Sequence, residues 1–507
     1  MLQFLLLLPI CGAVAVMLFG VTPRIALWGA FSFSLLSLAL AIAAFAKYAG
    51  EPLTSGIYDV SAPWISGLGV NLHFGYDGMS LLFILLTSIL TPVAILVAGF
   101  TIKERLTLYL ALLLFLEGAL IGVFLALDLV VFYFYWEAVL IPAYFLIGMW
   151  GGERRIYAAF KYVIYTMVGS LLMLVGILLL YAQSHSFNLL SLTGQSSAPI
   201  GGTVQDAAFL AFALAFGIKA AVFPFHSWVP DVYTESAPPT AIIMAGVLSK
   251  MGIYGFLRLC LPLFPDASRY FAPSIMVLAV IGIVYGALLA LDQTDIKRLV
   301  ACSSIAHLGF ITLGVFSLTT IGIQGSTLQA VNHGIIIGAL FALVAIVAAR
   351  WGTTDLAQLG GLATRAPILA AVFLVVTLAS LGLPGLNGFA GEFLVLTGTF
   401  QTHVAGPVFG VVVSVIGTVG VVLAAAYMLR LFQGAEHGAL GPAGVTGPSA
   451  APAGSTASWW SEMSVSQYAA LLPLIVLMAW IGIAPGGWLG PTSNAVHWIL
   501  TATGGQP

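Results

Sequence analysis

Charged residues are scarce in this sequence: Asp, Glu, Lys and Arg make up only 7% of its 507 residues. Soluble domains carry about 25% charged residues, so a chain this poor in charge cannot cover its surface with groups that water solvates. Hydrophobic residues make up 61% of the chain, and the mean hydropathy is +1.09. The composition excludes a soluble protein and predicts one that crosses a membrane many times.

Cysteine is also rare, and the patterns in which it binds metals or forms disulfide frameworks are missing. The three cysteines, Cys11, Cys260 and Cys302, lie far apart among apolar or small residues, with no CxxC pair. We therefore expect no disulfide framework, iron–sulfur cluster or structural zinc in this chain. The formal net charge of -2 likewise gives no sign of a nucleic-acid partner or of a polybasic membrane patch.

What the sequence does contain is long apolar runs. A membrane-crossing helix needs about 20 apolar residues, and polar, glycine and proline breaks divide the chain into fourteen such stretches. They cover residues 3–20, 25–46, 77–100, 106–126, 129–150, 158–182, 206–228, 238–261, 271–291, 299–317, 327–349, 366–396, 407–432 and 466–486. We expect an all-α polytopic membrane protein, with 434–465 as a flexible connector before the last span and a short helix near the C-terminus.

The basic residues test this count of spans. Loops that follow odd-numbered spans hold eleven of the sixteen Lys and Arg residues, loops that follow even-numbered spans hold three, and two lie inside spans. Because basic loops stay on the inner side of a membrane, this bias places both termini outside. No basic residue precedes the first span, so we expect it to be retained and not cleaved as a signal peptide.

Two of the expected spans contain helix-breaking residues. The seventh, in "IKAAVFPFHSWVP", contains Pro224, and the twelfth, in "LASLGLPGLNGFAGEF", contains Pro384 and four glycines. Proline removes a helical hydrogen bond, and inside a membrane such breaks are tolerated where they line polar cavities. The breaks lie five spans apart, so their segments run in opposite directions, which indicates inverted repeats with a site between them.

The breaks define the expected domains. We place five-helix repeats at spans 4–8 (101–261) and spans 9–13 (262–433). Spans 1–3 (1–100) precede the repeats, and span 14 with the tail (466–507) follows the connector.

Seven ionisable side chains lie well inside the expected spans, where each costs about 2.5–3.5 kcal/mol at a helix centre. They are Glu117, Glu137, Lys219, Lys250, His307, His333 and Glu392. A hydrogen bond between helices could explain any one of them. A set of acids, amines and imidazoles is instead what proton transfer through a membrane requires, because burial moves the pKa of such groups toward neutrality. Metal transport would need clustered ligands, which the sequence lacks.

Other charged groups are better explained by structural roles. His226, Asp231 and Glu235 follow the break in the seventh span, where polar side chains cap helix ends. The charged run "LDQTDIKR" (291–298) is interpreted as an inner loop that forms a contact or a hinge.

Four segments resemble the antiporter-like subunits of respiratory complex I, and among these the M subunit, called chain 4 in mitochondria. They are "FYWEAVLIPAYFLIGMWGGERRIYAAFKYVIYT", "KAAVFPFHSWVPDVYTESAPPTA", "LLALDQTDIKRLVACSSIAHLGF" and "LGLPGLNGFAGEF". The resemblance covers about residues 77–432 and agrees with fourteen spans. It implies a proton-translocating part of the membrane arm of an NADH:quinone oxidoreductase.

The resemblance also implies roles for the first three relay residues. Glu137 would pair with Lys219, and the pair would switch between a tight and a loose arrangement. Lys250 would be the central relay. An opposite charge within a few ångströms favours the ionised form of an amine, so the approach and withdrawal of Glu137 would load and unload Lys219.

The resemblance places the remaining groups farther along the row. His307 and His333 would extend the water-connected chain, and Glu392 would be the terminal group near the exit. The related L and N subunits carry a lysine at that last position, so a glutamate here favours M. The resemblance assigns no role to Glu117, and the segment 434–460 lies outside it.

Electron transfer would then take place in other subunits. We expect no cofactor or metal in this chain, and FMN, iron–sulfur clusters and quinone in its partners. Expected partners are the other membrane-arm subunits, especially L and N, and the lipid bilayer of a bacterial inner membrane. Three alternatives remain: the D component of a multi-chain Na+/H+ antiporter, the pump module of a membrane-bound hydrogenase or ferredoxin-fed complex, and a structural scaffold.

Overall fold

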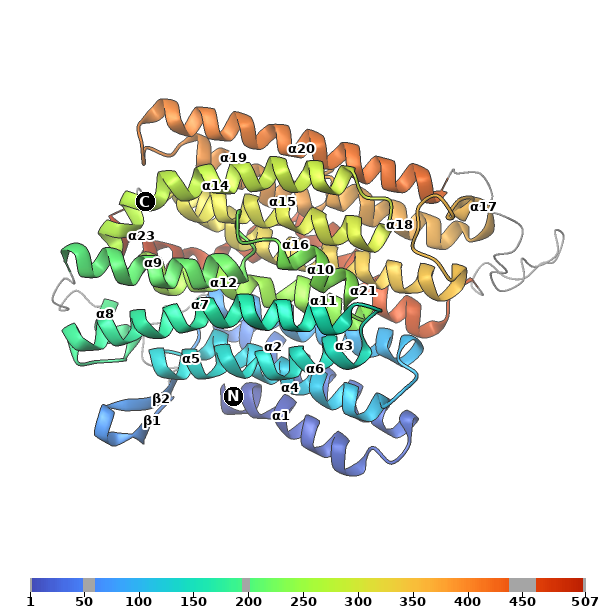
Figure 1. Cartoon of the computed structure of the whole chain (residues 1–507), viewed down its shortest axis with the longest axis horizontal. Coiled ribbons are helices and arrows are strands. Elements are labelled where there is room, and N and C mark those ends of the chain that lie inside the picture. Colours follow the sequence, from blue (N-terminus) through green and yellow to red (C-terminus); the bar gives the residue numbers. More distant parts are fainter. Residues whose placement is uncertain (1, 49–59, 194–200, 437–461, 505–507) are drawn as a thin grey trace.

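The computed structural model describes residues 2–48, 60–193, 201–436 and 462–504. In these residues, long helices lie side by side along the longest axis of the molecule (Figure 1). Twelve of the described helices are long and apolar enough to cross a membrane, against fourteen expected spans. The prediction of a polytopic helical membrane protein is confirmed.

The twelve candidate spans agree closely with the predicted apolar runs. They are α1 (Leu2–Phe19), α2 (Pro23–Tyr48), α3 (Gly78–Thr101), α4 (Leu106–Leu125), α5 with α6 (Leu129–Ala138 and Leu140–Trp150), α7 (Arg155–Ser184), the helix Pro238–Leu263, α14 (Pro265–Leu291), α15 (Ile296–Phe316), α16 (Thr320–Trp351), α20 (Pro407–Glu436) and α21 (Val465–Ile483). Short helices join or follow them: α8 (Leu189–Thr193), α17 (Leu362–Arg365), α22 (Gly486–Leu489) and α23 (Ser493–Thr503).

The two expected spans that lack an uninterrupted long helix are the seventh and the twelfth. The helices on either side of their breaks are α9 (Gly202–Lys219) and α10 (Trp228–Glu235), and α18 (Pro367–Ser380) and α19 (Asn387–Phe400). The interruptions predicted around Pro224 and Pro384 are therefore present. The first falls beside a proline, and the second beside a proline and two glycines, residues that prevent a continuous helical hydrogen-bond ladder.

One element was missed by the all-α prediction. Strands β1 (Val60–Ile65) and β2 (Val70–Phe74) pair antiparallel, with Val60 opposite Phe74. The turn between them contains Gly69 at a φ of 72°, a left-handed conformation that glycine adopts without strain. Short runs of β-branched and aromatic residues around such a turn are a hairpin signal, which the search for long apolar runs passes over.

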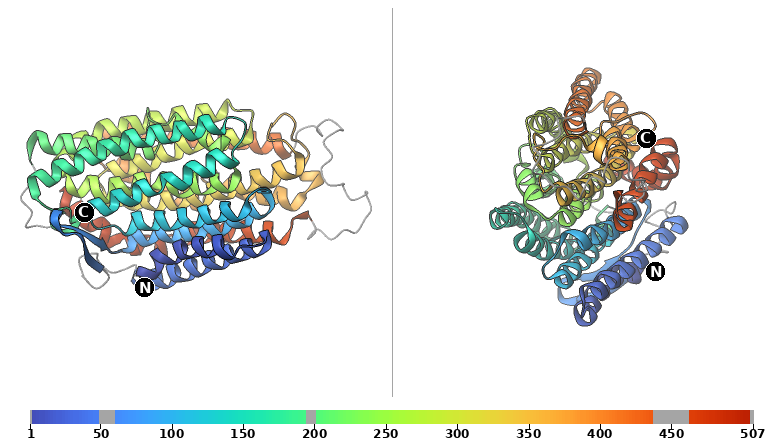
Figure 2. Two further views of the ribbon diagram at one scale, coloured as in Figure 1. Left: turned by 60° about the horizontal axis from the view of Figure 1, so that its bottom comes forward. Right: turned by 90° about the vertical axis from the view of Figure 1, so that its right-hand side faces the viewer.

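The helices form a buried centre and an outer layer. In α3, α15, α16 and the helix Pro238–Leu263, the most apolar stretch is entirely buried inside the protein. In α1, α2, α7, α14, α20 and α21, less than half of that stretch is buried. The end-on view in Figure 2 shows the central helices enclosed by the others. Ionisable groups on the central helices are therefore shielded from lipid by protein.

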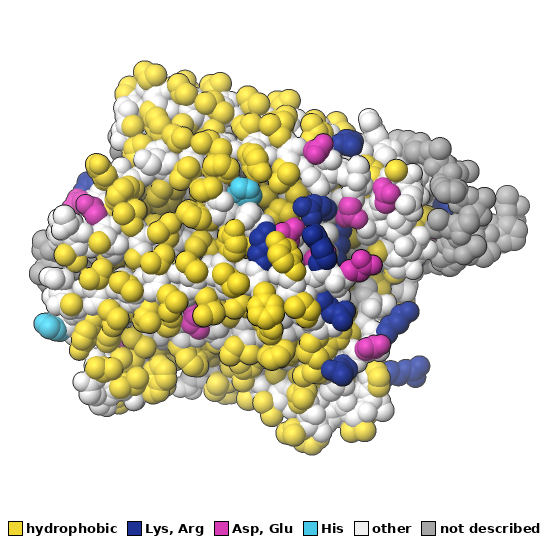
Figure 3. All heavy atoms as spheres, viewed as in Figure 1, with side chains coloured by type: hydrophobic (Ala, Val, Ile, Leu, Met, Phe, Trp, Pro, Cys, Tyr) yellow, Lys and Arg dark blue, Asp and Glu magenta, His cyan; other side chains and the backbone are white. Residues whose placement is uncertain are grey.

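The two ends of the molecule differ in charge. Both termini lie toward one end (Figure 2), which we call the terminal face. In Figure 3, Lys and Arg side chains gather toward the opposite end, the basic face, and a wide apolar band separates the two. The connector predicted at 434–465 lies mostly outside the described residues, which exclude 437–461.

Candidate functional site

Lys250 lies in the middle of the most irregular central helix. Two π-helical turns, Met244–Leu248 and Phe256–Cys260, flank α12 (Ser249–Gly255) and thus Lys250. Its side chain is completely buried, and its Nζ donates to the carbonyl of Ala245 at 2.5 Å. The same Nζ lies 2.8 Å from Nδ1 of His333 on α16. Single π-helical turns are frequent at functional sites. The turn Met244–Leu248 supplies the carbonyl of Ala245, which accepts the hydrogen bond from the Lys250 ammonium.

Four of the predicted relay residues form one buried row. From Lys250 it continues to His333, whose ring stacks on that of His307 with centroids 5.2 Å apart. Nδ1 of His307 lies 3.0 Å from Oε1 of Glu392. These groups come from α12, α16, α15 and α19, and each is at most 4% exposed. The fold brings together residues that lie up to 142 positions apart in the chain, Lys250 and Glu392.

Uncharged polar groups complete the far end of the row. The hydroxyl of Tyr427 lies 3.2 Å from Nε2 of His307, and the amide of Gln329 donates to Oε1 of Glu392 at 3.2 Å. Sequence reasoning missed both, because it searched only for charge and imidazole inside the spans. Gln329 lies one helical turn before His333, and that spacing was the available signal.

The first predicted pair is separated in this structure. Glu137 lies near the end of α5, and no ion pair within 4.0 Å joins it to Lys219 at the end of α9; the pairs among the described side chains do not include it. Oε1 of Glu137 is buried and has no hydrogen-bond partner. Nζ of Lys219 lies 3.0 Å from the hydroxyl of Tyr162 and 5.5 Å from the ring centre of Trp136. The two charges therefore lie in neighbouring but separate surroundings.

A helix irregularity lies directly after Glu137. α5 ends at Ala138 and α6 begins at Leu140. Pro142 lies four residues after Ala138, and a proline at that spacing cannot donate to the carbonyl of Ala138. The weakened hydrogen bonding leaves the end of α5 with fewer restraints than a continuous helix.

The helices that carry the two lysines, α9 and α12, are in close contact. A Cβ added to Gly252 would lie 2.4 Å from the carbonyl oxygen of Phe216 and 2.7 Å from the backbone nitrogen of Ala220. Gly252 follows Lys250 by two residues, and Ala220 follows Lys219 directly. Only glycine lets α12 approach the end of α9 this closely.

The second break lies against the end of the row. Gly382 adopts a φ of 78°, and a Cβ there would lie 3.1 Å from Oε2 of Glu392. Asn332 donates to the carbonyl of Asn387 at 2.7 Å, which joins α16 to the first residue of α19. The side-chain oxygens of Asn332 and Asn387 are buried without partners. The break thus borders a polar region, as expected for an interrupted helix in a membrane.

The groups after the first break have mainly structural contacts. Asp231 on α10 lies 2.6 Å from Nζ of Lys161 and 3.5 Å from Arg298, and Glu235 accepts from the backbone of Arg154 at 3.0 Å. The ring of His226 stacks on that of Phe223 and meets that of Tyr285 edge-on. The expected structural roles therefore agree with the contacts, although they are ion pairs between helices rather than caps alone.

Two residues of the charged run at 291–298, Asp295 and Lys297, form separate structural contacts. Asp295 caps α15 by accepting from the backbone of Arg298 at 2.8 Å, and it also bonds Thr354. Nζ of Lys297 donates to the carbonyl of Ser236 at 2.6 Å, next to the end of α10. The predicted contact between inner elements is present.

Glu117 does not join the row. It lies in α4, 1% exposed, and neither of its carboxylate oxygens has a hydrogen-bond partner. Its neighbour on α2 is Ser37, whose hydroxyl is also buried. We therefore assign Glu117 no role in the row.

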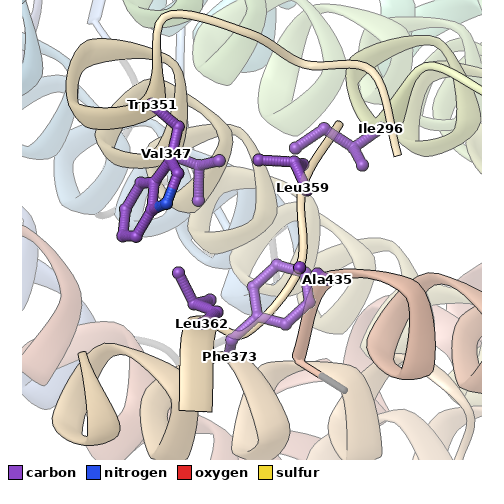
Figure 4. Close-up of a pocket in the computed structure, with 8 residues that line it drawn as sticks. Ile296, Val347, Trp351, Leu359, Leu362, Phe373 and Ala435 are labelled. Carbon is purple, nitrogen blue, oxygen red and sulfur yellow. The ribbon is translucent and has the colours of Figure 1, made fainter. Parts of the chain in front are cut away.

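The cavity in Figure 4 offers no site for a cofactor. It lies at the basic end of the helices, and its labelled lining side chains are apolar: Ile296, Val347, Trp351, Leu359, Leu362, Phe373 and Ala435. Its volume of about 10 Å³ has room for one water at most. In the described part of the chain, no group of three or more His, Cys, Asp or Glu residues could hold a metal ion.

Comparison with known proteins identifies the family. Residues 126–419 match the family described as "NADH:quinone oxidoreductase/Mrp antiporter, TM". The chain is similar to NADH-quinone oxidoreductase subunit M of Rickettsia prowazekii, with 38% identity over 440 residues, 86% of this chain and 85% of the relative. It is also similar to NADH-ubiquinone oxidoreductase chain 4 of Marchantia polymorpha, with 37% identity over 83% of this chain and 81% of the relative.

A solved structure agrees with the same assignment. A chain of respiratory complex I from Thermus thermophilus with bound NADH superposes with a TM-score of 0.87 at 32% identity, covering 100% of both chains. Fold and sequence similarity over most of the length point to one family. This chain belongs to the subunit M (chain 4) family of NADH:quinone oxidoreductases, the antiporter-like membrane subunits of complex I.

Proposed function

We propose that this chain conducts protons along the buried row from Lys250 through His333 and His307 to Glu392, loaded through the Glu137–Lys219 pair. It is a proton-pumping, antiporter-like subunit of the membrane arm. The single observation that carries the detailed proposal is the contact sequence from the Lys250 ammonium at 2.8 Å to His333 and from His307 at 3.0 Å to Glu392. All four groups can exchange protons, and all are buried.

In this proposal the two interrupted helices also cross the membrane. α9 with α10 and α18 with α19 would add two spans to the twelve long ones and give fourteen. The repeats would comprise spans 4–8 (101–261) and 9–13 (262–433), with a broken helix in each. The gathering of Lys and Arg at the basic face supports an orientation with that face inside and both termini outside. A bacterial inner membrane is the proposed location.

Loading depends on the distance between Glu137 and Lys219. When the carboxylate approaches, it stabilises the ammonium form of Lys219, and when it withdraws, the desolvated ammonium tends to release its proton. The separated arrangement described here corresponds to the release state. Gly252 brings the end of α9 close to α12, the helix that carries Lys250.

The second half of the transfer begins and ends at hydrogen bonds, Lys250 to His333 and His307 to Glu392. Lys250 donates toward Nδ1 of His333, and a proton that moves there leaves Lys250 as a neutral amine. The stacked rings of His333 and His307 do not share a hydrogen bond, so this step needs water or a rotation of one ring. His307 then passes a proton through Nδ1 to the carboxylate of Glu392. Proton transfer requires each donor and acceptor within hydrogen-bond reach or one water away.

Redox chemistry is assigned to other subunits. FMN, iron–sulfur clusters and quinone would lie in partner chains, and the antiporter-like L and N subunits would be the neighbours of this chain in the membrane arm. What this chain contributes is a shielded row of proton carriers and the two breaks beside it.

The test uses the assembled complex in proteoliposomes. We expect Lys250→Ala to reduce NADH-driven proton uptake about tenfold, since losing about 1.4 kcal/mol in one transfer step has that effect. Lys103→Ala, at an exposed position in the loop between α3 and α4, serves as the matched control. Normal proton uptake in an assembled Lys250→Ala complex would reject the row.

A further inference from the structure

A second buried cation lies on the same helix as Lys250 and has no part in the proposed row. Arg258 follows Lys250 by eight residues, about 12 Å along a helix, and is 1% exposed. Its Nη2 lies 2.5 Å from Oδ2 of Asp77, which is also buried. Asp77 caps the first turn of α3 through Ser80. A fully buried ion pair is costly to form and is weak support for stability alone, so its presence calls for an explanation.

The pair closes the end of the helix toward the terminal face. Trp498 of α23, near the C-terminus, covers the guanidinium with its ring centre 5.5 Å from Cζ. Tyr254 lies 3.2 Å from Nε and donates its own hydroxyl to the carbonyl of Phe124 at 2.9 Å. Elements from four parts of the chain therefore seal this position.

Lys250, Tyr254 and Arg258 are spaced four residues apart, so they follow one side of the helix toward the terminal face. This column of polar side chains leads from Lys250, at the start of the proposed row, toward the terminal face. A proton that left Lys250 along it would bypass His333 and everything after it.

The chemistry of Arg258 makes that route a poor conductor. A guanidinium does not lose its proton in proteins, so it cannot pass one on. A fixed positive charge also repels hydronium in a low-dielectric passage, as arginine does in channels that exclude protons. Nη1 of Arg258 is buried without a hydrogen-bond partner, so the guanidinium still presents an unused donor beside its ion pair with Asp77.

We infer that Arg258, held by Asp77 and covered by Trp498, is an electrostatic barrier that keeps protons on Lys250 from leaving directly to the terminal face. This inference rests on the proposed function, because it assumes that Lys250 carries protons. The barrier directs each proton to His333, and it makes transport depend on the second half of the chain. Arg258 is a selectivity-determining residue and does not itself transfer protons.

The test compares charge with shape at position 258 in the assembled complex. Proteoliposomes receive an acid pulse without NADH, and internal pH is followed with a trapped dye. Arg258→Gln removes the charge, and Arg258→Lys keeps it. We expect the first to raise the passive proton leak about tenfold, equivalent to about 1.4 kcal/mol of barrier, and to lower the number of protons moved per NADH. The second should leak no more than the parent.

A purely structural ion pair predicts a different pattern, in which both variants lose thermal stability and neither leaks. If Arg258→Gln does not assemble, the double variant Asp77→Asn with Arg258→Met replaces it, because removing both charges avoids a lone buried carboxylate. The leak should also disappear when Lys250→Ala is added to the leaky variant. Either an assembled charge-free variant without a leak, or a leak that persists without Lys250, would overturn the barrier.

Failure of the barrier and failure of the row are distinguishable. Lys250→Ala alone tests the row through NADH-driven uptake, whereas position 258 is tested by passive flux with no turnover. A complex that needs Lys250 for pumping and still shows no leak without Arg258 would sink the barrier and keep the row.

Discussion

The variant Glu137→Gln tests whether Glu137 acts as a switch that controls the protonation of Lys219 or only has a structural role. In this structure Glu137 forms no ion pair with Lys219, and its Oε1 has no partner, so the amide breaks no direct contact between them. We therefore expect the variant complex to assemble. Two unit charges about 4 Å apart interact by about 4 kcal/mol at an effective dielectric constant of about 20, which is about a thousandfold in an equilibrium. The approach of a charged Glu137 would shift the protonation equilibrium of Lys219 by this factor. A neutral Gln at position 137 would not.

The assay is NADH-driven proton uptake by the reconstituted complex, with assembly followed by the subunits that co-purify. We expect uptake to fall at least tenfold in Glu137→Gln. This is less than the thousandfold shift in Lys219 protonation given above, because other groups also act on Lys219. Glu153→Gln, the next carboxylate along the chain and an exposed one, is the matched control. Uptake equal to the control would refute the idea that Glu137 loads Lys219.

Three further predictions address packing and the ends of the row. Gly252→Ala should lower the thermal stability of the complex by about 1–3 kcal/mol, because its Cβ would lie 2.4 Å from a backbone oxygen; an unchanged melting temperature would contradict the close helix contact. Glu392→Gln should reduce proton uptake by roughly half or more while the complex still assembles, because hydrogen bonding persists but proton exchange does not; full uptake would remove Glu392 from the row. Asp231→Asn should cost about 1 kcal/mol of stability, typical of a partly exposed ion pair, and lost uptake without lost stability would contradict its structural role.

The arrangement of spans could be predicted well because membrane helices are coded locally. Twenty apolar residues and a basic loop are visible without knowledge of the fold, and so are helix breakers such as Pro224 and Pro384. The hairpin at Val60–Phe74 could not be found in this way, because its signal is short and lies between long apolar runs. The seventh and twelfth predicted runs, in which the breaks were recognised, are each divided into two helices, and neither is among the twelve long helices.

The residues of the site could be predicted from the sequence, but the contacts between them could not. Charge inside an apolar run marked Lys250, His307, His333 and Glu392 individually, since such groups are costly in a membrane. Their order in space depends on how α12, α15, α16 and α19 pack, which no local pattern encodes. The partners Tyr162, Gln329 and Tyr427 were missed because an uncharged polar residue in a span is common and carries little signal on its own.

A continuous route for protons through the middle of the molecule requires water where the side chains do not touch. The most direct measurement is a cryo-EM map of the assembled complex in a lipid bilayer, at a resolution that reveals ordered water. We predict water between Nζ of Lys219 and Nζ of Lys250, and beside the unpartnered Nε2 of His333. Apolar side chains filling both places, with no density for water, would contradict the route.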